Sequence, residues 1–221
     1  PKVGTYYLSY LDLSNNGFEG SIPSELETFF FLMYLNLSHN GLEGSIPSEI
    51  GTSYYFMHLD LSNNAFENNV PSELCGLVNM VTLDLSSNLF NGTFPTCIVN
   101  LFWLNSVALD NNQFSGSIKA LPTSLQILTF SNNKLSGTIP PQLGKCKGLL
   151  ALVLSNNNLS GSIPSQLSSL RSLQFLVLSN NSLNGTLSPS LSNLKSLNTI
   201  MLDNNLLSGS ITTLFTNMRN L

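Results

Sequence analysis

The chain has 221 residues, and only 9% of them are charged, with 12 acidic against 8 basic side chains. The resulting net charge of −4 provides no overall basic balance of the kind that nucleic-acid binding requires, so nucleic acid is not an expected partner. No stretch approaches the roughly 18 consecutive apolar residues that a membrane-spanning helix needs. We therefore expect contact with a membrane only through segments absent from this chain.

The charges are divided unevenly along the chain. Residues 1–118 contain eleven acids and the single base Lys2, which gives −10, whereas residues 119–221 contain seven bases and the single acid Asp203, which gives +6. Asymmetry of this kind indicates a polarity in how the molecule binds a partner.

One pattern, LDLSNNGFEGSIP at residues 11–23, returns eight more times with edits. A fixed period decides the architecture before any single residue does. The copies are spaced by 24 residues, except for one interval of 21 residues. Each contains a Leu-x-Leu pair that alternates inward and outward, as in a short strand with one buried face. We therefore expect strands that start near Leu11, Leu35, Leu59, Leu83, Val107, Leu128, Leu152, Leu176 and Ile200.

An asparagine occupies one column of every copy. Its amide offers two donors and an acceptor, which can satisfy the backbone groups that are freed where the chain bends away from each strand. Aspartate would bring a buried charge to this position, and leucine would leave those backbone groups unpaired. The column contains Asn16, Asn40, Asn64, Asn88, Asn112, Asn133, Asn157, Asn181 and Asn205.

Two further columns follow the asparagine. The first is Phe or Leu, as at Phe18, and two residues later stands Gly20 or its equivalent, with Asn68 as the one replacement. Glycine and asparagine tolerate a positive φ, so this column predicts a turn. The unit then returns through apolar positions that suit a short helix or 3₁₀ segment, such as Leu167, Leu170 and Leu173.

The pattern LxxLxLSxNxLSGxIPxxLxxL, as in residues 149–170, resembles the plant-type extracellular leucine-rich repeat, and the resemblance covers residues 8–221. It implies an α/β solenoid, a right-handed coil with a parallel β-sheet on its concave face and short helical or 3₁₀ segments on its convex face. It also implies a second short sheet beside the Gly-x-Ile-Pro turn, and an extracellular or cell-surface location. Members of this family include ectodomains of receptor-like kinases and receptor-like proteins, and polygalacturonase-inhibiting proteins.

We expect residues 1–221 to form a single domain of about nine repeats. Nine strands spaced by about 4.8 Å give a sheet roughly 38 Å long. Neither end of the sequence contains the capping segment that solenoids use to cover their apolar end faces, so we expect both caps to be missing. The shortened link at residues 120–124 should change the curvature locally or straighten the convex segment.

The three cysteines allow at most one internal disulfide. Cys146 falls in a buried column and is expected to pack as a small hydrophobe. Cys75 and Cys97 lie on adjacent turns but two columns apart, which leaves their pairing open. The resemblance to secreted proteins favours glycosylation over chance for five Asn-x-Ser/Thr sequences, at Asn36, Asn91, Asn158, Asn180 and Asn184.

The candidate ligand site is the concave face, where outward side chains flank the buried leucines. This surface begins aromatic and acidic and ends largely apolar, and such side chains are the usual anchors of protein and peptide recognition. The alternative is a solvated sheet whose ligand contacts repeats outside this chain. The candidate ligand-binding residues are Tyr10, Asp12, Tyr34, His58, Asp60, Asp84, Ile127, Thr129, Phe175, Val177 and Met201.

A second candidate surface is a flank patch that consists of Phe31, Tyr55 and Trp103. A contiguous apolar patch suggests a partner site. The alternative interpretation is that Tyr54 or Tyr55 turns inward because Ser53 occupies a core column. The bases that follow on this flank would then be ordinary solvated residues, at Lys147, Arg171, Lys195 and Arg219.

No residue pattern supports catalysis, a metal site or a cofactor. His39 and His58 have no cysteine or serine arranged as a nucleophile pair, and the sequence has neither metal-ligand spacing nor a phosphate-binding glycine loop. We therefore expect a non-catalytic recognition module, part of a receptor-like ectodomain that binds a peptide, protein or glycan on its concave face. A co-receptor would be a further partner.

Two other classes stay open. A secreted enzyme inhibitor that resembles polygalacturonase-inhibiting proteins would use the acidic concave surface as its contact. An ice-binding protein would use a regular outward column of hydroxyls, although Asn69 interrupts this column and threonines are few. The column contains Ser21, Ser45, Thr93, Ser117, Thr138, Ser162, Thr186 and Ser210.

Overall fold

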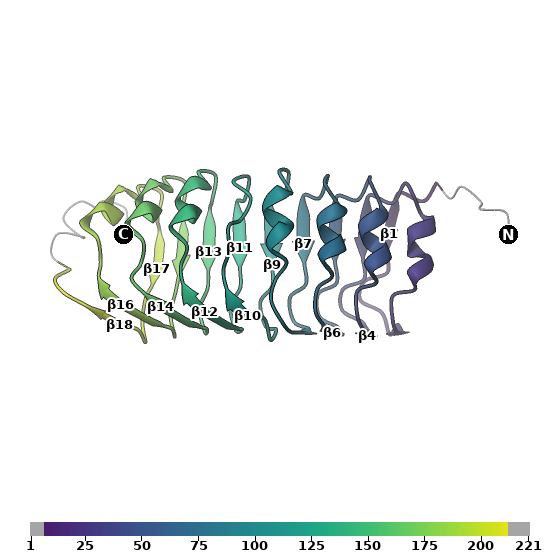
Figure 1. The fold of residues 1–221 in the computed structure, drawn as a ribbon, viewed down its shortest axis with the longest axis horizontal. Helices are drawn as coiled ribbons and strands as arrows, with labels where there is room; N and C mark the ends of the chain where they lie inside the picture. The colour runs from purple at the N-terminus through teal and green to yellow at the C-terminus, as the bar shows by residue number, and fades with distance from the viewer. Residues whose placement is uncertain (1–6, 212–221) are drawn as a thin grey trace.

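The computed structural model describes residues 7–211, which form a solenoid of stacked repeats (Figure 1). Each repeat adds one strand to a nine-stranded parallel sheet, the concave sheet, in chain order. Leu11 lies opposite Leu35, and equivalent pairs continue to Ile200, so the predicted register is confirmed. Its strands are β1 (Tyr10–Asp12), β3 (Tyr34–Asn36), β5 (His58–Asp60), β7 (Thr82–Asp84), β9 (Ser106–Ala108), β11 (Ile127–Thr129), β13 (Ala151–Val153), β15 (Phe175–Val177) and β17 (Thr199–Met201).

The second short sheet is present in two parts, which run along the lower edge of the solenoid in Figure 1. Backbone hydrogen bonds from Gln113 N–H to Phe90 O (2.8 Å) and from Ser115 N–H to Gly92 O (2.7 Å) continue across the junction. The first part contains β2 (Glu19–Gly20), β4 (Gly41–Gly44), β6 (Ala65–Asn68) and β8 (Leu89–Phe90), and the second contains β10 (Ser115–Ser117), β12 (Lys134–Thr138), β14 (Asn158–Gly161), β16 (Ser182–Thr186) and β18 (Leu206–Ser208).

The return segments contain short 3₁₀ helices, as expected. The residue before each helix is proline in six of seven cases, because proline supplies the fixed φ of this entry turn. The shortened link at residues 120–124 contains a turn and no helix, so the convex segment is straightened there. The described helices are η1 (Ser24–Thr28), η2 (Ser48–Thr52), η3 (Ser72–Gly76), η4 (Thr96–Asn100), η5 (Pro141–Lys145), η6 (Ser165–Ser169) and η7 (Pro189–Asn193).

Each asparagine of the invariant column from Asn40 onward links its own repeat to the preceding one. The Nδ2 group of Asn112 donates to Leu109 O and Asp110 O within its own repeat. It also donates to Leu85 O of the preceding repeat (2.9 Å), and its Oδ1 accepts the N–H of Phe90 (3.0 Å). The same four bonds recur at Asn40, Asn64, Asn88, Asn133, Asn157, Asn181 and Asn205.

Two columns of the repeat have a left-handed backbone. The glycine column and its replacement Asn68 have φ between 68° and 91°, which confirms the predicted turn. The residue before each invariant asparagine also has a positive φ, between 53° and 56°, which the sequence pattern did not reveal. This residue is asparagine in every repeat except at His39 and Ser87, because asparagine tolerates this conformation better than most residues.

The cysteines divide between a bridge and the core. Cys75 and Cys97 form a disulfide that joins η3 to η4, with their Cα atoms 5.9 Å apart, so the pairing that the sequence left open is made. Cys146 is buried and unpaired. Burial raises the pKa of its thiol, so this cysteine stays protonated and packs as a small hydrophobe, as expected.

The substitution Asn112→Ala tests the role of the asparagine column. It removes the acceptor of the buried Phe90 N–H and leaves the Leu85 carbonyl with only the bond from Asn88 Nδ2 (3.2 Å), so we expect a loss of roughly 1–3 kcal/mol in the free energy of unfolding. Urea denaturation gives this value, with Asn100→Ala, at an exposed position in η4, as the control. An Asn112→Ala midpoint equal to that of the wild type would contradict the assigned role.

Candidate functional site

An aromatic row crosses the N-terminal end of the concave sheet. The register places Tyr10, Tyr34 and His58 side by side on β1, β3 and β5. The rings of Tyr10 and Tyr34 stack with centroids 4.1 Å apart, and that of His58 lies 5.9 Å from that of Tyr34. His58 Nδ1 is 2.9 Å from the hydroxyl of Thr82, which orients the imidazole. The structure therefore brings these three candidate residues into one contiguous row.

A second row on the same strands is acidic. Asp12, Asp60 and Asp84 lie in one column with Asn36, and each carboxylate accepts the backbone N–H of the serine two residues later. Burial raises the pKa of Asp84, and the negative charges of Asp60 and Asp110 add to this increase, whereas the hydrogen bonds of Ser86 oppose it.

Asp110 belongs to this acidic region but was not among the candidate residues from the sequence. It follows β9 by two positions, and its Oδ1 accepts the N–H of Ser131 in the next repeat (2.6 Å). The repeat pattern does not align Asp110 with Asp84, because Asp110 stands two positions after the column that contains Asp84. The exposed Asp12 differs from Asp84, since the hydrogen bonds of Ser14 lower the pKa of its carboxyl.

The C-terminal end of the concave sheet is apolar. Ile127, Phe175 and Met201 are exposed on β11, β15 and β17, although they are large hydrophobic side chains. Thr129 and Val177 are half-buried on the same face. The candidate residues thus form two areas on one sheet, an aromatic and acidic area and an apolar one.

Two residues of the flank patch, Tyr55 and Trp103, are exposed and the third, Phe31, is half-buried; the inward tyrosine that one interpretation expected is not found. Tyr54 and Tyr55 are 63% and 46% exposed, because both lie in the turn that follows η2. Phe56 is fully buried instead, and the hydroxyl of Ser53 is buried without a hydrogen-bond partner. Trp103, at the equivalent position two repeats later, is 68% exposed.

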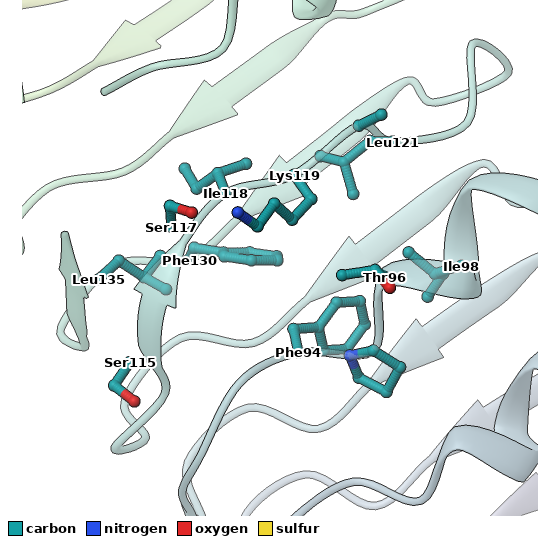
Figure 2. Close-up of a pocket in the computed structure, with 12 residues that line it drawn as sticks. Phe94, Thr96, Ile98, Ser115, Ser117, Ile118, Lys119, Leu121, Phe130 and Leu135 are labelled. Atoms are coloured by element: carbon teal, nitrogen blue, oxygen red, sulfur yellow. The ribbon is translucent and has the colours of Figure 1, made fainter. Parts of the chain in front are cut away.

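The shortened repeat encloses a small cavity next to the straightened link. Figure 2 shows Phe94, Ile98, Leu121 and Phe130 among its lining residues. The ring of Phe94 packs edge-to-face against that of Phe130, with centroids 5.7 Å apart. The cavity has a volume of about 20 Å³, which is room for a water molecule but not for a ligand.

The five glycosylation sequences have unequal exposure. Asn36 lies on the concave sheet, is half-buried, and its Oδ1 accepts the N–H of Ser38 (2.9 Å). The remaining four are exposed and lie outside the concave sheet: Asn91, Asn158, Asn180 and Asn184. Glycosylation at any of them stays a prediction.

The substitution Asp84→Asn tests the electrostatic state of the acidic row. A carboxyl whose pKa is raised by folding binds its proton more tightly in the folded state, so its charge lowers stability at neutral pH, and this penalty fades as the pH falls to the ordinary aspartate value of 3.8. Asp84→Asn keeps an acceptor for Ser86 and removes the charge. We therefore expect a higher urea midpoint than that of the wild type at neutral pH, and equal midpoints below about pH 3.8.

Asp12→Asn is the matched control for this measurement. Folding lowers the pKa of Asp12, so its charge contributes stability above the ordinary aspartate pKa and loses that contribution as the pH falls. The control should therefore have a lower midpoint at neutral pH. A neutral-pH midpoint of Asp84→Asn at or below that of the wild type would show that the charge of Asp84 costs nothing.

Comparisons with known proteins identify the family. Models of the leucine-rich repeat match residues 7–29, 31–53, 56–77, 79–101 and 123–183. Comparison with curated proteins gives no significant match. Among the described residues, none of the helices has the length and apolar character that crossing a bilayer requires.

Three solved structures illustrate the likeness. The plant peptide hormone receptor RGFR1 in complex with RGF2 has a TM-score of 0.93 and 31% identity over 97% of this chain and 35% of the receptor. The Arabidopsis receptor kinase HAESA, in complex with the peptide hormone IDA and the co-receptor SERK1, has a TM-score of 0.86 and 38% identity. This match covers 91% of this chain and 34% of HAESA. A plant ice-binding protein has a TM-score of 0.80 and 29% identity over 92% of this chain and 66% of the ice-binding protein.

The chain spans about a third of the length of the two receptors, at 35% and 34%, so the likeness concerns their repeats and not the whole proteins. The family models match the repeats whose strands form the concave sheet and whose return segments contain the 3₁₀ helices. This chain belongs to the plant-type extracellular leucine-rich repeat family.

Proposed function

We propose that this chain is a non-enzymatic recognition domain that binds an extended peptide along its concave sheet. The observation that supports this proposal best is the exposure of large side chains on a rigid sheet face. Tyr10, Ile127, Phe175 and Met201 all point outward from strands, although the fold gains nothing from their exposure. Aromatic and apolar anchors on a preorganised surface are the usual source of binding energy in peptide recognition.

The similar receptors support the choice of a peptide. RGFR1 and HAESA are each in complex with a peptide hormone, and HAESA is also in complex with a co-receptor. We therefore propose a peptide ligand and a second protein as the partners of this chain. A role as an enzyme inhibitor remains an alternative for the same acidic face.

An oxidising environment fits this function. The disulfide between Cys75 and Cys97 joins two exposed return segments, and such bridges persist in secreted and cell-surface proteins but not in the reducing cytosol. We propose that the chain works outside the cell.

The concave site can be tested by selecting binders from a displayed library of random dodecapeptides. Phe175→Ser removes an exposed anchor without opening the core. We expect it to raise the Kd of synthetic copies of the selected peptides about tenfold, as loss of an aromatic anchor commonly does. Leu206→Ser, at an exposed position in β18 outside the concave sheet, should leave their Kd unchanged. Equal Kd values for Phe175→Ser and the wild type across all selected peptides would exclude this site.

Ice binding is a second candidate function, because one observation favours it. The sheet of β10, β12, β14, β16 and β18 presents two rows of small side chains around its glycines, and the outer row is exposed at Ser117, Thr138, Ser162 and Thr186. A similar structure is that of a plant ice-binding protein. Threonine and serine at a fixed rung spacing could match a water lattice.

Thermal hysteresis of the purified chain tests this candidate. An ice-binding surface should give a gap between the freezing and melting points that Thr138→Lys reduces, because lysine disrupts the regular row. Lys134→Thr, four residues earlier on the same strand and outside this row, is the control. Equal freezing and melting points for the wild type would exclude ice binding.

A further inference from the structure

A hollow on the flank of the first repeats lies beside the proposed peptide site. It is lined by Met33, Tyr55, Met57, Val81 and Trp103, which we call the aromatic shelf, together with Asn79. Its volume is about 240 Å³, and its exposed lining is mostly apolar. Met33, Met57 and Val81 directly precede β3, β5 and β7, so the shelf adjoins the edge of the concave sheet.

The side chains of the shelf are held in place before any partner binds. The ring of Tyr55 stacks on that of Phe31, with centroids 5.5 Å apart, and meets that of Tyr54 edge-to-face at 5.4 Å. The Nδ2 group of Asn79 donates to Tyr54 O (2.8 Å), which ties two adjacent turns together. Aromatic side chains that are already ordered lose little conformational entropy on binding.

The repeat itself does not require these aromatic residues. The positions equivalent to Tyr55 and Trp103 in later repeats are Gly148, Ser172 and Ser196, which stand in the same turn three residues before their strands. The fold therefore accepts glycine or serine there. Large apolar side chains exposed at such a position reduce solubility unless a partner covers them.

The charge beside the shelf defines what can cover it. Asp60 and Asp84 are the last residues of β5 and β7 and follow Met57 and Val81 by three residues, which places them about 10 Å farther across the sheet. Residues 7–118 contain no lysine or arginine, so no base of these repeats can neutralise the two carboxylates. An anionic membrane surface would be repelled by the same charges.

We propose that the aromatic shelf, together with Asp60 and Asp84, docks a protein segment that has a large apolar side chain and, about 10 Å away, a lysine or arginine. The apolar side chain fills the hollow, and the base pairs with the carboxylates. The inference rests on the proposed recognition function and adds the chemical class of the partner at the N-terminal repeats.

A second selection from the dodecapeptide library tests the proposal, with counter-selection against the variant Trp103→Ser. Peptides that survive should share Phe, Leu or Trp with Lys or Arg two to four positions away. Synthetic copies should bind Trp103→Ser and Asp60→Asn about tenfold more weakly than the wild type, as expected for loss of an anchor. The matched control is Phe102→Ser, because Phe102 is the adjacent residue, is 74% exposed and does not line the hollow.

The outcomes separate this proposal from the proposed function. Peptides that depend on Phe175 but not on Trp103 would support the concave site and overturn the docking role of the shelf. The shelf proposal also fails if the selected peptides are acidic, or if no peptide depends on Trp103. Sedimentation velocity provides a further check, since self-association that Trp103→Ser abolishes would mean that a second copy of the chain covers the hollow.

Discussion

The fold depends on one hydrogen-bonding unit, the invariant asparagine that joins each repeat to the one before it. Through its amide, Asn112 satisfies three carbonyls and one N–H, two of them in the preceding repeat. A short strand cannot bury an apolar face alone, so a solenoid exists only if neighbouring repeats stay aligned. The asparagine provides that alignment at the bend, where the ladder of the concave sheet has ended and backbone groups would otherwise be unpaired.

Because inward positions maintain the fold, the outward positions are free to vary between repeats. The buried leucines of the concave sheet are nearly identical in every repeat, whereas their outward neighbours change from Tyr10 and Tyr34 to Phe175 and Met201. The same contrast holds on the flank, where Trp103 and Ser172 occupy equivalent turns. Because the buried scaffold is constant, the outward side chains determine the chemistry of the surface that a partner meets.

The architecture could be predicted from the sequence alone, because the repeat period, the asparagine column and the glycine turn each have a local physical cause. It did not predict the left-handed residue before each asparagine, since Asn15 and its equivalents could equally have been solvated polar residues. The interpretation that Tyr54 or Tyr55 turns inward was wrong, because both tyrosines lie in the exposed turn that follows η2. The disulfide and the proximity of Asp110 to Asp84 depend on how adjacent turns are stacked, which spacing along the chain does not determine.

Native-state hydrogen exchange of the backbone amides tests the role of the asparagine column most directly. The N–H groups of Phe66, Phe90 and Phe114 donate to side chains of the next repeat, at Asn88, Asn112 and Asn133. If these bonds hold the repeats together, the three amides exchange only through global unfolding, as slowly as the amides of the central concave strands. Fast exchange of these amides while the concave strands stay protected would contradict the account.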